Sequence, residues 1–155
     1  MSEDAWAPPL HTIGYEGRTA AEVLDALLDA GVGTLLDVRE LPLSRKAGLS
    51  KKALAAACEE AGIGYAHERA LGNPKAIRKG GGSSSEIIAA FRAHLDAAVA
   101  SGDPLVRAAL DAAALLHRAS GPVCLLCYEA DPETCHRTVV AERLAGELGV
   151  DVEAL

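Results

Sequence analysis

Most side chains that could take part in chemistry lie in one stretch of fourteen residues, 124–137. This stretch holds three of the four cysteines, one histidine, one arginine and three carboxylates: Cys124, Cys127, Glu129, Asp131, Glu133, Cys135, His136 and Arg137. A thiol close to a histidine and a carboxylate can act as a nucleophile, as half of a redox pair or as a metal ligand. We therefore expect the chemistry of this chain to lie here.

Cys124 and Cys127 form a Cys-x-x-Cys pattern within a strand-like apolar run over residues 123–128. Side chains three positions apart on a strand point to opposite faces of the sheet, so the two thiols should not share a ligand site. We predict that Cys124 is a small core residue and that the pattern is not half of a metal site.

The candidate catalytic residues are Cys127, Glu129, Cys135 and His136. Cys127 and Glu129 are two positions apart and can face the same way where the strand ends. Cys135 is predicted to lie in the first turn of a helix that begins at Pro132, where unpaired backbone N–H groups and the helix dipole lower the pKa of a thiol. Packing in the core is the alternative role for Cys127.

Three roles remain open for these residues. Cys135 can act as a nucleophile with His136 or Glu129 as its proton partner. Cys127 and Cys135 can instead form a reversible disulfide, or they can bind zinc together with a histidine. Because the sequence lacks a compact four-ligand pattern, we assign no metal ligand and name no cofactor.

A second polar cluster, Arg39 and Arg45, follows a pattern typical of a buried strand. With Arg18 and Arg137, these side chains can form a guanidinium pocket that binds a phosphate or carboxylate through paired hydrogen bonds. The alternative is structural, because an arginine at the end of a strand can simply pair with a neighbouring carboxylate such as Asp37.

The order of the predicted elements is that of a layered α/β domain. Apolar runs without helical periodicity predict strands at 10–13, 32–38, 63–66, 123–128 and 150–152. Capping residues and terminal glycines predict helices at 19–30, 50–61, 83–101, 103–119 and 131–148. We predict a single domain over residues 1–155, with a mostly parallel central sheet of four to five strands flanked by helices.

This architecture should bring separate polar segments together. Parallel sheets bind ligands at the carboxyl ends of their strands, so residues 14–18, 37–45 and 127–137 should meet at one edge. Residues 67–85 show no periodicity and are predicted to form a basic, glycine- and serine-rich loop. Loops of this length within a compact domain are usually either functional or disordered. Residues 1–9 are predicted to be a disordered or extended N-terminal tail.

The composition is globular, with 50% hydrophobic and 24% charged residues. The net charge of -7 disfavours nonspecific attraction to DNA or to a lipid surface, although residues 38–80 carry nine Lys or Arg against four Asp or Glu. No apolar run approaches the length of a membrane span, and the first residues lack the pattern of a signal peptide. We predict a cytoplasmic protein with reduced cysteines and no membrane partner.

The chain resembles the DUF488 family, small prokaryotic proteins without an assigned function. The resemblance extends over residues 11–146 and is carried by residues 12–18, 37–39, 42, 44–45, 65, 71–72, 126–129 and 135–137. It implies a shared pocket that involves Tyr15, Arg39, Arg45, Cys127, Glu129, Cys135, His136 and Arg137. It implies no particular substrate or reaction.

The leading hypothesis is an enzyme that acts on a small anionic, phosphorylated or nucleotide-like substrate. Arginines would hold the anion, and a cysteine would be the nucleophile or redox centre. A noncatalytic module that binds a nucleotide or nucleic acid through residues 38–80 is one alternative, and a thiol redox or zinc sensor is another. Nucleic acid is the less favoured partner, because the chain is acidic and few aromatic residues accompany its basic block. We make no prediction of the oligomeric state.

Overall fold

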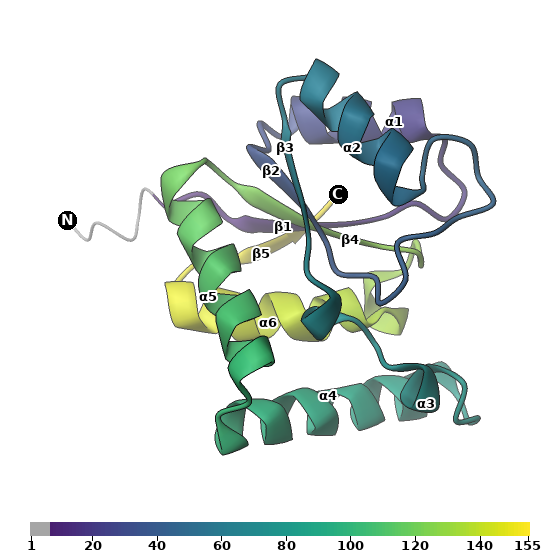
Figure 1. The fold of residues 1–155 in the computed structure, drawn as a ribbon, viewed down its shortest axis with the longest axis vertical. Helices are drawn as coiled ribbons and strands as arrows, with labels where there is room; N and C mark the ends of the chain where they lie inside the picture. The colour runs from purple at the N-terminus through teal and green to yellow at the C-terminus, as the bar shows by residue number, and fades with distance from the viewer. Residues whose placement is uncertain (1–6) are drawn as a thin grey trace.

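A computed structural model describes residues 7–155 of the chain. Five parallel strands form one sheet in the order β3-β2-β4-β1-β5 (Figure 1). The strands are β1 (Leu10–Gly14), β2 (Thr34–Asp37), β3 (Gly64–His67), β4 (Val123–Cys127) and β5 (Val152–Ala154). β4 lies between β1 and β2, so the carboxyl ends of these three strands are neighbours. The predicted α/β class with a parallel sheet is confirmed.

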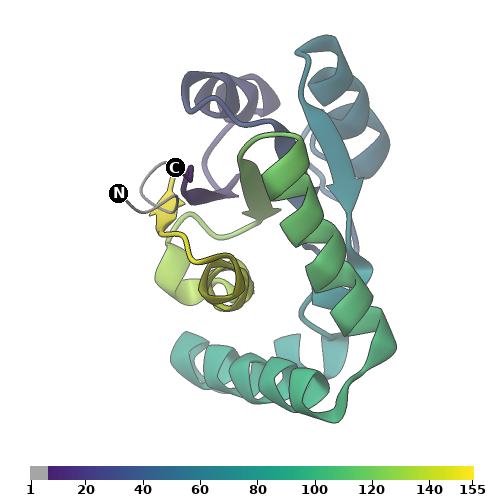
Figure 2. The same ribbon diagram turned by 90° about the vertical axis from the view of Figure 1, so that its left-hand side faces the viewer.

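Helices cover both faces of the sheet (Figures 1 and 2). One face, called here the closed face, is covered by α1 (Ala20–Asp29) and α2 (Lys51–Glu60). The other, called the pocket face, is covered by α5 (Pro104–Ala119) and α6 (His136–Leu148), with α4 (Ser84–Ser101) packed on α6 farther from the sheet. The shorter elements are η2 (Arg69–Leu71), α3 (Lys75–Arg78) and η3 (Pro132–Thr134).

Each face of the sheet has its own apolar core, because successive strand residues point in opposite directions. On β4, Cys124 and Leu126 belong to the closed-face core, whereas Leu125 and Cys127 belong to the pocket-face core. Cys124 is fully buried. The predictions that Cys124 is a core residue and that Cys127 points to the opposite face are confirmed.

Local capping signals set the ends of the helices. The Thr19 hydroxyl accepts a hydrogen bond from the Glu22 N–H at 3.1 Å, and the Glu22 carboxylate accepts one from the Thr19 N–H at 3.0 Å. Ser83 and Glu86 form the same capping box at the start of α4. Gly149 ends α6 in the left-handed conformation, with φ of 70°. These positions agree with the sequence prediction.

The last helix starts later than predicted, at His136 instead of near Pro132. Asp131 caps the chain as expected, but its carboxylate accepts the Glu133 N–H at the start of the short 3-10 helix η3. Cys135 then adopts an extended conformation, with φ of -122° and ψ of 139°, and separates η3 from α6. The prediction that Cys135 lies in the first helical turn is therefore wrong, because this thiol occupies the position just before the helix.

Two other segments also differ from the prediction. Residues 67–85 contain η2 and α3, which are too short to show a periodic sequence pattern. The final strand begins at Val152, opposite Leu10, because residues 150–151 lead the chain out of α6. Residues 1–6 of the predicted N-terminal tail lie outside the described part of the chain. Within residues 7–155, no helix is both long and apolar enough to cross a membrane.

Candidate functional site

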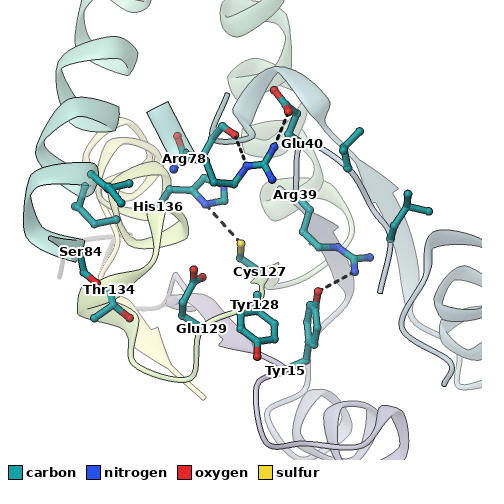
Figure 3. Close-up of a pocket in the computed structure, with 15 residues that line it drawn as sticks. Tyr15, Arg39, Glu40, Arg78, Ser84, Cys127, Tyr128, Glu129, Thr134 and His136 are labelled. Carbon is teal, nitrogen blue, oxygen red and sulfur yellow. Dashed lines mark hydrogen bonds and ion pairs between the residues drawn. The ribbon is translucent and has the colours of Figure 1, made fainter. Parts of the chain in front are cut away.

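A cavity of about 330 Å³ opens at the carboxyl edge of the sheet (Figure 3). Its walls come from the exits of β1, β2 and β4, from residues 40–43 and 73–78, from the start of α4 and from the turn between β4 and α6. Strand ends of a parallel sheet leave such a crevice because the chain departs from neighbouring strands in different directions.

Cys127, Cys135 and His136 form a thiol–imidazole cluster beside this cavity. The Cys127 Sγ lies 3.5 Å from the His136 Nδ1, and all three donor atoms of the cluster lie within 4.8 Å of one another. The His136 Nε2 lies 2.8 Å from the Val38 carbonyl oxygen. A carbonyl oxygen can only accept, so Nε2 carries a proton and Nδ1 is the ring nitrogen that faces the Cys127 sulfur.

The two thiols of the cluster have very different proton affinities. Burial alone would raise the pKa of Cys135, but hydrogen bonds from Cys127 and His136, with the charges of His136 and Arg137, hold that pKa well below its ordinary value. The hydrogen bond with Cys135 and burial raise the pKa of Cys127 well above its ordinary value. The pair therefore favours one thiolate and one thiol at neutral pH.

Glu129 lines the cavity next to the cluster. Burial, followed by the charge of Cys135 and a hydrogen bond with it, raises the pKa of the Glu129 carboxyl to about 7. The backbone of this turn is fixed by Arg137, whose guanidinium donates to the carbonyl oxygens of Glu129 and Ala130. A Cβ on Gly14 would lie 1.8 Å from the Glu129 carbonyl oxygen, so only glycine lets the end of β1 approach the turn so closely.

Arg39 also lines the cavity, but its guanidinium is bonded within the protein. It donates to both carboxylate oxygens of Asp37, at 2.9 and 2.7 Å, and to the Leu49 carbonyl oxygen at 2.7 Å. The Tyr15 hydroxyl lies 3.3 Å from it, and Asp37 accepts a further bond from Tyr65. Burial opposes the charge on Arg39, but the bonds to Asp37 outweigh burial and raise the guanidinium pKa. The structural alternative considered for Arg39 is the one observed.

The comparison with known families agrees with the sequence resemblance. The family described as "Domain of unknown function DUF488" matches residues 19–144 of the 155 residues. The chain belongs to the DUF488 family. No curated protein and no solved structure matches it. The matched segment of this DUF488 chain includes the whole turn from β4 to α6 and leaves out β1 and β5.

The site residues predicted for this DUF488 chain divide into two groups. The cavity is lined by Tyr15, Arg39, Cys127, Glu129 and His136. The other four do not line it: Arg18, Arg45, Cys135 and Arg137. Of these, Arg18 donates to the Leu155 carbonyl oxygen at 3.1 Å, and Arg45 is exposed. The four predicted arginines thus do not form one guanidinium pocket.

Two polar residues of the DUF488 cavity, Asn73 and Arg78, were not among the predicted site residues. Arg78 is 40% exposed and pairs with Glu40 at 3.1 Å. The Asn73 side chain is buried, and its Oδ1 has no hydrogen-bond partner. Both residues belong to the aperiodic segment 67–85, whose unusual length was the available signal that it had a role.

Proposed function

We propose that this DUF488 chain is an enzyme that acts on a small anionic substrate bound in the cavity at the carboxyl edge of the sheet. The observation that supports it most strongly is the convergence of Cys127, His136 and Glu129 on one cavity that also contains a half-exposed arginine, Arg78. Catalytic centres commonly combine thiol, imidazole, carboxyl and guanidinium groups in one concave site.

Each group has a role that follows from its position. Cys127 and His136 bring the thiol–imidazole cluster to the cavity, while Cys135 lies behind them and is 1% exposed. Glu129 exchanges protons with the substrate, because its carboxyl lies beside the cluster and within the cavity. Arg78 holds the anionic group, since its pairing with Glu40 is half-exposed and can be exchanged for a ligand.

The rest of the cavity suggests the shape of the substrate. Four aliphatic side chains contribute to its wall: Leu41, Leu43, Ile87 and Ile88. Leu43 is 68% exposed, and the Tyr128 ring is 44% exposed at the same wall. A molecule with an apolar or planar body and one anionic group would cover these surfaces and reach Arg78.

Calorimetry with a panel of inorganic phosphate, a sugar phosphate, a nucleoside monophosphate and a dicarboxylate tests this proposal. We expect at least one compound to bind, and Arg78→Ala to weaken its binding about tenfold, the effect of losing one charge-assisted hydrogen bond. Arg92→Ala is the matched control, because Arg92 of α4 forms an exposed pair with Glu142 of α6 and does not line the cavity.

Turnover separates an enzyme from a binding module. Cys127→Ala should bind the same compound with little change in affinity but fail to convert it. If the wild-type protein binds the compound and leaves it chemically unchanged, the noncatalytic alternative is favoured. Binding of nucleic acid has less support than binding of a small anion. Two of the nine basic residues in the 38–80 block, Arg39 and Arg78, already pair with acidic side chains.

A thiol redox function is the second candidate, and it is supported by the proximity of the Cys127 and Cys135 sulfur atoms. A disulfide oxidant such as oxidised glutathione would accept two electrons from the thiol–thiolate pair, together with its one thiol proton and a second proton from solvent, and leave one intramolecular disulfide. Oxidation should then lower the thiol count from four to two. Cys135→Ser would remove this change, and an unaltered thiol count in the wild type would exclude the redox function.

A further inference from the structure

The thiol–imidazole cluster contains the donor atoms that a zinc ion prefers. Two sulfur atoms, from Cys127 and Cys135, and a ring nitrogen of His136 lie within 4.8 Å of one another. Pairs of ligand atoms around a tetrahedral zinc ion are separated by roughly 3.3–3.8 Å, given bond lengths of about 2.0–2.3 Å. The 3.5 Å between the Cys127 Sγ and the His136 Nδ1 already falls in this range.

The imidazole is held in the orientation that a metal ligand requires. Its Nε2–H donates to the Val38 carbonyl oxygen, which leaves the Nδ1 lone pair for a metal. The Phe91 ring packs edge-on against the imidazole, with centroids 5.0 Å apart. A histidine that is fixed by a backbone acceptor at one nitrogen and by packing on its ring is typical of metal sites, because both contacts remove rotational freedom before the metal binds.

We propose that Cys127, Cys135 and His136 bind one zinc ion, with a fourth coordination position open to the cavity. Cys127 and His136 line the cavity and Cys135 lies behind them, so the three ligands close the site on the protein side. Three protein ligands and one open position are the arrangement of catalytic zinc sites, whereas structural sites use four protein ligands.

The charges of such a site balance. Binding of Zn²⁺ displaces the one remaining thiol proton, and the two thiolates then offset the charge of the ion while the imidazole is a neutral ligand. A buried ion needs this compensation, and all three ligand residues are buried. Thiolate and imidazole ligands also disfavour Mg²⁺ and Ca²⁺, which prefer oxygen ligands.

This inference deepens the proposed function, since it rests on the same cavity and names the group that meets the substrate. With zinc bound, both sulfur atoms are ligands, and the open position takes the place of a free thiol as the point of contact. Glu129 lies beside that position, where it can exchange a proton with a zinc-bound water or substrate.

Cobalt titration of the full chain, after removal of metal with a chelator, tests the site directly. Co²⁺ occupies tetrahedral thiolate sites and gives a sulfur-to-cobalt charge-transfer band, so we expect one equivalent per chain, displaced by Zn²⁺. Cys135→Ser should weaken binding more than the roughly 10–100-fold loss caused by changes around a metal ligand. Cys124→Ala, on the opposite face of the same strand, should bind cobalt as the wild type does.

A second measurement avoids variants that fold poorly. Zn²⁺ should protect Cys127 and Cys135 of the wild-type protein from alkylation, as read by mass spectrometry of peptides. Absence of the charge-transfer band, or equal alkylation with and without Zn²⁺, overturns the zinc site. Calorimetry of the metal-free protein with the anionic panel tests the proposed function independently of the zinc site. Anion binding without cobalt binding rejects only the zinc site. Cobalt binding without any anion binding rejects only the proposed substrate class.

Discussion

The closed face and the pocket face of the sheet each bury cysteine residues, but they place them in different surroundings. On the closed face, Cys124 and Cys58 are fully buried in the apolar core formed with α1 and α2. Burial raises the pKa of the Cys124 thiol well above its ordinary value and that of Cys58 to about 11. On the pocket face, Cys127 and Cys135 lie next to an imidazole and close to a cavity.

The comparison shows that the exit of the strand, rather than the strand itself, provides the polar surroundings. Cys124 lies inside β4, where both neighbouring strands continue past it, whereas Cys127 is the last residue of β4. Beyond Cys127 the chain turns back through η3 to α6, and this return brings Cys135 and His136 to the strand end. At the exit of β2, by contrast, the buried Asp37 and Arg39 are paired with each other.

The largest expected difference between the faces is in thiol reactivity. In the native, metal-free protein, an alkylating reagent should modify the pocket-face pair first, because Cys135 has a lowered pKa and Cys127, next to it, lines the cavity. Cys124 and Cys58 are fully buried, so their modification should wait for unfolding and be slower on the order of 1,000-fold or more. Peptide mass spectrometry over a time course measures both rates, and similar rates at Cys124 and Cys127 would remove the distinction between the faces.

The buried ion pair should contribute most to the stability of the β2 exit. Asp37→Asn leaves the Arg39 guanidinium charged, 5% exposed and without its carboxylate, which should lower the free energy of unfolding by about 3–5 kcal/mol. Glu40→Gln, which disrupts the half-exposed pair with Arg78, is the matched control and should cost less than about 1 kcal/mol. Urea denaturation compares the two, and equal losses would contradict a special role for the buried pair.

The close approach of β1 to the turn after β4 should matter both for stability and for the position of the metal ligands on the pocket face. Gly14→Ala places a methyl group against the Glu129 carbonyl oxygen, so we expect a loss of about 1–3 kcal/mol and weaker cobalt binding, since the turn leads to Cys135. Gly146→Ala is the control, because nothing lies within 4 Å of the added atom and the position is inside α6. That change should stabilise the protein by about 0.5–1 kcal/mol. Thermal unfolding and cobalt titration of both variants should move in these directions.

The smallest expected effect concerns the closed-face cysteine. Cys124→Ala removes one buried sulfur atom and should cost about 1 kcal/mol in unfolding free energy. Binding of the anionic ligand should not change, because this side chain faces away from the cavity. A large loss of ligand binding in Cys124→Ala, measured by calorimetry, would show that the two faces are coupled through β4.

The sequence alone predicted the features that depend on neighbouring residues. The alternation of side chains on a strand was enough to send Cys124 and Cys127 to opposite faces. Capping boxes at Thr19 and Ser83 were enough to start two helices, and the order of the elements was enough for a parallel α/β sheet. The rule that ligands bind at strand ends also pointed to the edge where the cavity lies.

Tertiary structure alone decided which of the polar side chains meet. Arg39 had several acids within reach along the chain, and packing gave it Asp37 in a paired contact. Cys135 lies beside Cys127 because it is itself the extended residue between η3 and α6, a break in the helix that no capping signal revealed. Arg78 reaches the cavity from a segment without periodicity. Distances between residues far apart in the chain depend on how whole elements pack, and local sequence patterns carry little information about that packing.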